Sequence, residues 1–483
     1  MHFKSTFLKN FLTVGLWTFV SRIFGFCRDI MLAAFLGSGP IGEAFIIAFS
    51  LPNIFRRFFA EGAFNAAFIP MFKKNMHNKK QSTEFTNNTL STMILILFIF
   101  TIISIIIMPL LVFAMASGFE NDVRFETSVI YGRITFPYIF FVSLSSLFAG
   151  ILNSYGKFGV VSATPIFLNL FLIFAMILSY ILDWEVGIML SISIPLSGIL
   201  QLIVLIHTTR KLGYFPKLKI PKFNGKIRKL LIIALPAVLT GGVIHINLLV
   251  GRQIASYYEG AIAWLNYADR LYQLPLGVVG VALGSVLLPK LSEKIQLDNS
   301  SELHNVVSHA LKIAAILIFP ATAALIILPV PIITVLFERG EFSIIDSKNT
   351  ASALSIYATG LPAFVLHKIF TPIFFSKGDT KTPFRIAVFS MLANIILAIS
   401  LIGHFEFLAP VLSTSISSWI MAFALYHKSK KLGFYFDWKL IKEIIMILVS
   451  TIILSLVLIL AQKEWFYLLT TNNFSLFYLI ILI

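Results

Sequence analysis

Apolar segments long enough to cross a lipid bilayer recur through the whole sequence. A spanning helix needs about 20 mostly apolar residues. The chain of 483 residues is 58% hydrophobic and 12% charged, whereas soluble domains carry about 25% charged residues. We therefore predict an all-α, polytopic membrane protein with about 14 transmembrane helices. The predicted spans are 10–36, 41–72, 88–115, 129–153, 158–182, 186–208, 229–256, 261–289, 304–336, 347–375, 383–403, 406–427, 440–462 and 465–483.

The loops between these segments alternate in charge. One set holds most lysines and arginines, including the basic stretch from Arg210 to Lys229, and the other holds acidic sequences such as LDWE and YYEG. Loops rich in Lys and Arg face the cytoplasm, so both termini are predicted to be cytoplasmic. This topology accounts for most of the net charge of +16, and no nucleic-acid partner is predicted.

A repeat relates the two halves of the chain. HTTRKLGYF begins at His207 and HKSKKLGFY at His427, an offset of 427 − 207 = 220 residues. Six spans in each half give both halves the same orientation, as in transporters built from parallel repeats. We predict an N-terminal six-helix lobe over residues 1–217, a C-terminal six-helix lobe over 218–438 and two extra helices over 439–483.

The first span carries charges within its apolar stretch. A charge at the centre of a span costs about 2.5–3.5 kcal/mol on insertion scales, so such residues pair, meet water or bind a ligand. At a helical ~100° per residue, the polar positions of SRIFGFCRD share an arc of about 120°. They are Ser21, Arg22, Gly25, Arg28 and Asp29. This face is predicted to line a membrane cavity for an anionic substrate.

Two other spans add charged residues. In the second span, Arg57 and Glu61 are four residues apart, so that they can pair on one helix face, whereas Arg56 has no evident partner nearby in the sequence. In the eighth span, Asp269 precedes Arg270. Arg270 therefore has two open interpretations, a ligand for the substrate or a partner for a carboxylate.

Arginine is in surplus among these residues. Five arginines (22, 28, 56, 57 and 270) face three carboxylates (29, 61 and 269). Arginine binds phosphate bidentately and stays charged at physiological pH. A phosphate or pyrophosphate ligand would satisfy the surplus.

No motif for nucleotide or metal chemistry accompanies the arginines. The sequence lacks GxxxxGK[ST] and HExxH, the patterns of a phosphate-binding loop and a zinc protease. Its single cysteine, Cys27, excludes an intrachain disulfide and a Cys-based metal site. No evident nucleophile or base set stands beside the arginines. No catalytic residue, cofactor or metal is predicted.

Several stretches resemble the MurJ family of lipid II flippases, within the superfamily that includes multidrug and toxin exporters. They are SRIFGFCRD (21–29), LPNIFRRFFAEGAFNAAFIP (51–70), FPYIFF (136–141) and ADRLYQLPLGVVGVALGSVLLPKLS (268–292). The resemblance covers essentially the whole chain. It implies two six-helix lobes, two extra helices that form a lipid-tail groove, and transport of lipid-linked peptidoglycan precursor across the bacterial cytoplasmic (inner) membrane for cell-wall synthesis.

The resemblance also implies a site and partners. Substrate binding falls on Arg22, Arg28, Asp29, Arg56 and Arg270, with supporting roles for Ser21, Glu43, Arg57, Glu61, Asp269 and Gln273. Glu43 stands where some members have aspartate, and Gln273 where some have a carboxylate, which leaves Arg270 less neutralised. The implied partners are lipid II, membrane lipids and a monovalent ion, since some members bind sodium in the second lobe.

Three functions stay open at this point. The first is an alternating-access flippase for lipid II, and the second is an exporter of another polyprenyl-pyrophosphate-linked oligosaccharide. The third is a membrane-embedded enzyme acting on polyprenyl pyrophosphate, which would need a reactive group beside the arginines.

Overall fold

The computed structural model describes residues 2–59, 63–221, 225, 227–230, 232, 247–295 and 300–471. The regular structure in these ranges is helical, which confirms the all-α prediction. Eight helical segments within them are long and apolar enough to cross a membrane. The chain forms two compact units, Met1–His245 and Ile246–Ile483, whose boundary lies after the expected division at residue 217.

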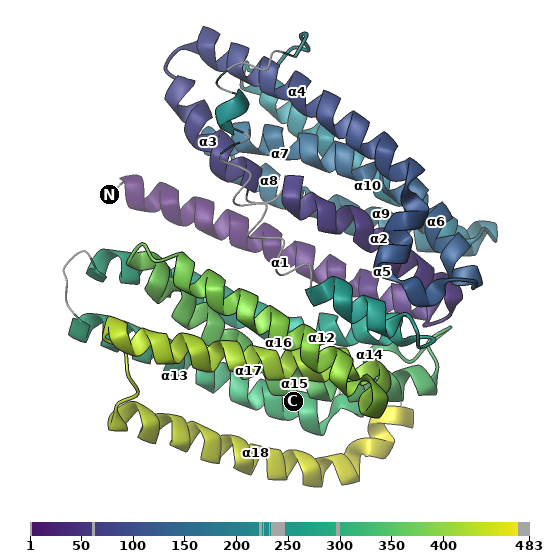
Figure 1. The fold of residues 1–483 in the computed structure, drawn as a ribbon, viewed down its shortest axis with the longest axis vertical. Helices are drawn as coiled ribbons and strands as arrows, with labels where there is room; N and C mark the ends of the chain where they lie inside the picture. Colours follow the sequence, from purple (N-terminus) through teal and green to yellow (C-terminus); the bar gives the residue numbers. More distant parts are fainter. Residues whose placement is uncertain are drawn as a thin grey trace. The chain divides into compact units, whose positions relative to one another are not determined.

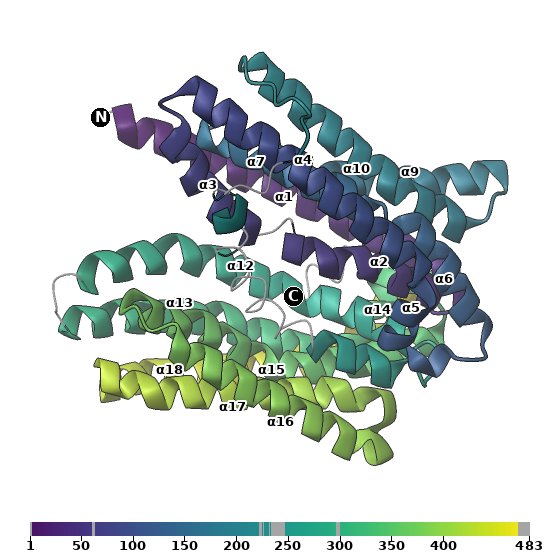
Figure 2. The same ribbon diagram turned by 45° about the horizontal axis from the view of Figure 1, so that its top comes forward.

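The first unit holds the helices up to α10, and α7 lies against α4 and α10 (Figures 1 and 2).

Proline lies at several of the breaks between the helices of the first unit. Pro109 and Pro165 occupy the first turns of α5 and α9, where a missing N–H leaves no helical hydrogen bond unmade. The bounds are α1 (His2–Leu36), α2 (Pro40–Phe59), α3 (Ala63–Asn75), α4 (Lys79–Ile106), α5 (Met108–Met115), η1 (Ser117–Phe119), α6 (Val123–Thr135), α7 (Tyr138–Ser154), α8 (Phe158–Ala163), α9 (Pro165–Leu182) and α10 (Val186–Lys211).

The second unit begins with helical residues 247–255. In it α15 packs against α12, α13 and α17. The bounds are α12 (Ala261–Ile295), α13 (Ser300–Ile327), α14 (Pro329–Phe337), α15 (Ile344–Ser376), α16 (Lys381–Phe405), η2 (Glu406–Leu408), α17 (Ala409–Ser429), η3 (Lys430–Leu432) and α18 (Trp438–Thr471).

One predicted boundary is wrong. The sequence QKEW, residues 462–465, was expected to separate the last two spans, but α18 runs through it without interruption to Thr471. Gln, Lys and Glu are good helix formers, and the stretch has no Gly or Pro to end the helix. Residues 472–483 and most of the predicted seventh span, 229–256, lie outside the described residues.

The helix bounds of the two units repeat at the offset seen in the sequence. Shifted by 220 residues, α4 would cover 299–326, and α13 spans Ser300–Ile327. The same shift moves α10 to 406–431, and α17 spans Ala409–Ser429. The halves differ where α6 and α7, separated at Phe136 and Pro137, correspond to the single helix α15.

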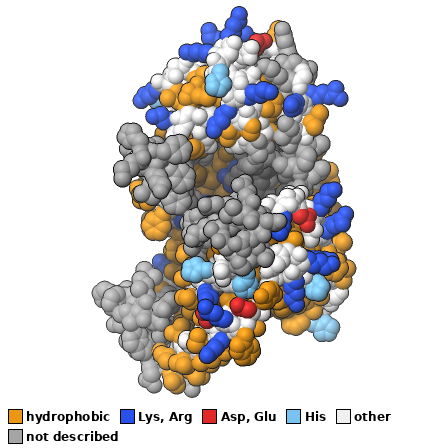
Figure 3. Space-filling view, turned by 90° about the vertical axis from the view of Figure 1, so that its left-hand side faces the viewer, with side chains coloured by type: hydrophobic (Ala, Val, Ile, Leu, Met, Phe, Trp, Pro, Cys, Tyr) orange, Lys and Arg blue, Asp and Glu red, His pale blue; other side chains and the backbone are white. Residues whose placement is uncertain are grey.

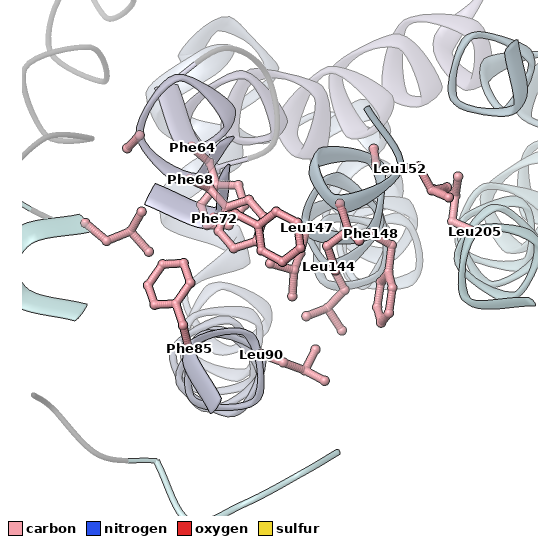
Figure 4. Packing of buried hydrophobic residues seen from close by; sticks show 14 of the residues in the cluster. Phe64, Phe68, Phe72, Phe85, Leu90, Leu144, Leu147, Phe148, Leu152 and Leu205 are labelled. Atoms are coloured by element: carbon pink, nitrogen blue, oxygen red, sulfur yellow. The ribbon is translucent and has the colours of Figure 1, made fainter. Parts of the chain in front are cut away.

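Stacked aromatic rings hold α3 against α4 and α7 (Figure 4). Phe64, Phe68 and Phe72 recur every four residues on α3, with successive ring centroids 5.3 and 5.6 Å apart, and Phe68 stacks on Phe85 of α4 at 5.7 Å. On α7, a Cβ added at Gly150 would come within 3.0 Å of the Phe68 ring. Because helix association in a bilayer depends on close packing, this glycine lets α7 approach the rings.

In each unit, exposed basic residues gather at particular helix ends. Figure 3 shows a face on which Lys and Arg are far more conspicuous than Asp and Glu. In the first unit the exposed cations lie at the end of α3, the start of α4 and the end of α10. In the second unit they lie around the α15–α16 turn and between α17 and α18. Alternate helix ends therefore carry the charge pattern predicted from the loops.

Candidate functional site

The charged stretch at residues 21–29 lies within the unbroken helix α1, where it separates one accessible cation from a buried ion pair. Arg22 is exposed, and within the described part of the chain no hydrogen bond or ion pair joins its guanidinium to another residue. Arg28 and Asp29 are only 7% and 8% exposed. Arg22 is therefore the accessible cation of this stretch.

A buried network fixes Arg28. Its Nη2 and Nε donate to Asp29 Oδ1 at 2.6 and 3.0 Å, and its Nη1 donates to Asn169 Oδ1 on α9 at 2.8 Å. The Asn169 Nδ2 donates in turn to the backbone oxygen of Ser21 at 3.0 Å. A single amide thus connects both ends of the charged stretch to α9, while Asp29 neutralises Arg28.

Asn169 was not identified from the sequence. It lies 141 residues from Arg28, in the apolar run PIFLNLFLIF of α9, and is 6% exposed. Its polarity within that run was the available signal, because a buried amide in a membrane helix needs hydrogen-bond partners.

Asn169→Ala is expected to lower the thermal stability of the purified protein in detergent. The substitution leaves a buried Arg28 N–H without its acceptor, which costs about 1–3 kcal/mol. Asn169→Asp keeps that acceptor and loses only the donor to Ser21, so its loss should be smaller. Equal melting temperatures for wild type and both variants would contradict the role given to this amide.

The second span contributes Arg56, which is half-buried in α2. Arg56 takes part in contacts within the structure. The Arg57 side chain and Glu61 lie outside the described residues, so their predicted pairing remains a prediction.

Glu43 lies in a second buried ion pair. It is in the first turn of α2 and is 0% exposed, and its Oε2 accepts a hydrogen bond from Arg124 Nη1 at 2.8 Å. Arg124 Nε also donates to Asp122 Oδ2 at 2.7 Å, and its guanidinium lies 4.3 Å from the Phe119 ring centroid. Burial raises the pKa of Asp122, but hydrogen bonds from the Arg124 backbone and side chain outweigh it, so the pKa is lowered overall. The arrangement ties α2 to α6.

In the second unit, α12 presents Asp269 and Arg270, both half-buried. Gln273, one turn further along, donates through Nε2 to Asp269 Oδ2. Tyr272 stacks on Tyr357 of α15 with ring centroids 5.0 Å apart, which anchors this part of α12. Glutamine at position 273 thus donates a hydrogen bond to Asp269, whereas a carboxylate at this position would repel Asp269.

A groove of about 500 Å³ lies between α13 and α18 in the second unit. Lys312 of α13 and Glu443 of α18 form an ion pair in its lining, and the rest of the lining is mostly apolar, including Ile316, Met446 and Leu454. His304 Nε2 of α13 and Oδ2 of Asp437, the residue before α18, lie 3.2 Å apart and make a second polar link. Within the described residues, no three His, Cys, Asp or Glu side chains are grouped so as to hold a metal ion.

Known proteins resemble the chain over nearly its full length. A sequence model of the family described as "Lipid II flippase MurJ" matches residues 32–482. A "Probable lipid II flippase MurJ" of Rhizobium tropici is 39% identical over 466 residues, which cover 95% of this chain and 87% of the relative. A "Lipid II flippase MurJ" of Burkholderia cenocepacia is 31% identical over 447 residues, 88% of this chain and 84% of the relative.

Solved structures agree with this relationship. "Lipid II flippase MurJ, inward closed conformation" has a TM-score of 0.83 and 27% identity, covering 98% of this chain and 96% of that one. An inward-facing multidrug resistance MATE family transporter of the MOP superfamily shares the fold at a TM-score of 0.70 and 15% identity, covering 86% of this chain and 94% of that one. This multi-pass bacterial membrane protein therefore belongs to the lipid II flippase MurJ family.

Proposed function

We propose that the protein moves lipid II from the inner to the outer leaflet of the bacterial cytoplasmic membrane by alternating access. The observation that carries this proposal is the family match over residues 32–482. The two repeated units support the mechanism, because transporters of this type expose a substrate site to each side in turn through movements of their repeats. The protein acts as a transporter and not as an enzyme.

The charged side chains suit the diphosphate of this substrate. We propose that Arg22 and Arg56 of the first unit and Arg270 of the second contact it during the cycle, while Arg28, held by Asp29 and Asn169, supports this part of α1. Arg22 supports this assignment most directly, since it is an exposed cation within a mostly apolar helix. A guanidinium can donate two parallel hydrogen bonds to a phosphate and stays charged throughout.

The groove between α13 and α18 suits the polyprenyl tail. Its lining is mostly apolar, and residues 439–483 are the segment that the resemblance assigns to a tail groove. We propose that the basic helix ends, among them the start of α18, face the cytoplasm, and that both termini lie on that side, as the alternating loop charges of the sequence predict (Figure 3). An inside-negative potential then favours outward movement of the anionic headgroup by about 2.3 kcal/mol per charge per 100 mV.

Reconstitution in vesicles tests the proposal. Purified protein is inserted into vesicles that carry fluorescent lipid II, and an impermeant reagent reports the label on the outer leaflet. The protein should accelerate exchange of lipid II between leaflets, and a polyprenyl pyrophosphate with a different oligosaccharide should exchange more slowly. Exchange no faster than in protein-free vesicles would refute the function, and equal rates for both lipids would refute the assignment to lipid II. Release of phosphate would indicate an enzyme instead.

A further inference from the structure

In the second unit, Lys368 of α15 places its charge against the middle of the neighbouring helix α12. Lys368 lies on α15 and is exposed, and its Nζ donates to the backbone oxygen of Leu276 on α12 at 3.4 Å. Leu276 is central in α12, 15 residues after Ala261 and 19 before Ile295 (276 − 261 and 295 − 276). A lysine that snorkels directs its charge toward the membrane surface. Lys368 instead directs its ammonium to a mid-helix carbonyl.

The surface of α12 makes room for this ammonium. A Cβ added at Gly280 would lie 2.7 Å from Lys368 Nζ and 3.7 Å from its Cδ and Cε. Any larger residue would displace the end of the lysine side chain. Gly280 therefore provides the space in which the charge of Lys368 rests.

Arg270 and Gly280, which receives Lys368 of α15, border one strip of α12. Gly280 follows Arg270 by ten residues, which places it about 15 Å further along the axis and about 80° around it. Between them, Gln273 and Gly277 occupy the i+3 and i+7 positions of the strip. The strip thus consists of one exposed amide and two glycines, with a cation at each end.

We propose that Lys368 is a further contact for the anionic headgroup, used in sequence with Arg270 along this strip. Arg270 and Gly280 lie about 15 Å apart along the axis of α12, so the two cations would meet the headgroup at different depths. The C-terminal half of α12 contains the basic residues Lys290 and Lys294, so Lys368 would engage the diphosphate farther from the acidic YYEG loop than Arg270 does. The inference rests on the proposed function of the protein.

The test measures lipid II exchange as a function of lipid II density in vesicles. Lys368→Gln should raise the apparent KM by about tenfold, the loss expected for one charge-assisted hydrogen bond, and leave kcat nearly unchanged. Lys368→Arg should restore most of the affinity, since it keeps the charge. Gly280→Ala should raise KM in the same direction by a smaller factor, because its Cβ meets only the flexible end of the lysine.

Two matched variants serve as controls, one for the loss of a positive charge and one for a Gly-to-Ala change in a helix. Lys348→Gln removes the same charge from an exposed position of the same helix, and Gly403→Ala adds a Cβ that meets nothing within 4 Å. Both should behave as wild type. If wild type exchanges lipid II and folded Lys368→Gln has the wild-type KM, the role of Lys368 is refuted while the proposed function stands. Failure of wild type itself refutes the function.

Discussion

Arg22→Ala is expected to reduce lipid II exchange by about 100-fold at low substrate density. A bidentate contact between a guanidinium and a phosphate comprises two charge-assisted hydrogen bonds of about 1.5 kcal/mol or more each, and every 1.4 kcal/mol is a factor of ten. Arg22→Lys should recover only part of the loss, because lysine keeps the charge but not the planar fork. The measurement is the initial rate of exchange in vesicles with equal amounts of inserted protein.

Two comparisons separate a ligand from a structural residue. Arg22 is exposed, so Arg22→Ala should retain the wild-type melting temperature. Arg210→Ala removes an exposed arginine that stacks on Phe215 at the end of α10, and it should exchange lipid II normally. An Arg22→Ala protein with full activity would remove Arg22 from the proposed site.

Arg124→Ala is expected to destabilise the first unit by about 3–5 kcal/mol, since it leaves a buried carboxylate without its partner. The carboxylate is Glu43, which is 0% exposed and receives the Arg124 Nη1 hydrogen bond at 2.8 Å. A large fall in the melting temperature and in the yield of folded protein should follow. Thermal unfolding of the detergent-purified variants measures both effects.

The same pair predicts a compensating change. Glu43→Met combined with Arg124→Met removes both charges together and should recover much of the stability, as apolar replacements of buried ion pairs often do. Arg133→Ala, at an exposed position of the same helix α6, should melt as wild type does. Full exchange activity of the folded double variant would show that Glu43 supports the structure and does not contact the substrate. Normal stability of Arg124→Ala would contradict the assignment.

The helical segments and the charged positions were predictable because they depend on local patterns. Apolar runs and alternating loop charges gave the segments, and the charges within apolar runs gave Arg22, Arg56 and Arg270 as candidates. The resemblance added Glu43, but the sequence did not indicate that Arg124 would hold it. That pairing brings together residues 81 positions apart, which only the packing of α2 on α6 determines.

Other side-chain partners on separate helices were likewise not predictable from the sequence. Arg28 pairs with its neighbour Asp29, as the sequence allowed, but its second anchor, Asn169, comes from α9. The space for Lys368 depends on Gly280 of another helix. The last predicted boundary failed for a local reason, since charge alone marked QKEW as a loop although its residues favour helix.

The length of the unbroken helix α18 makes its tilt depend on the thickness of the membrane. Its 34 residues extend about 51 Å at 1.5 Å per residue, whereas the hydrocarbon layer is about 30 Å thick. A rod longer than its surroundings is accommodated by leaning or by thickening the lipid around it. Lipids with different acyl-chain lengths would therefore change the tilt of α18 and, with it, the width of the groove between α13 and α18.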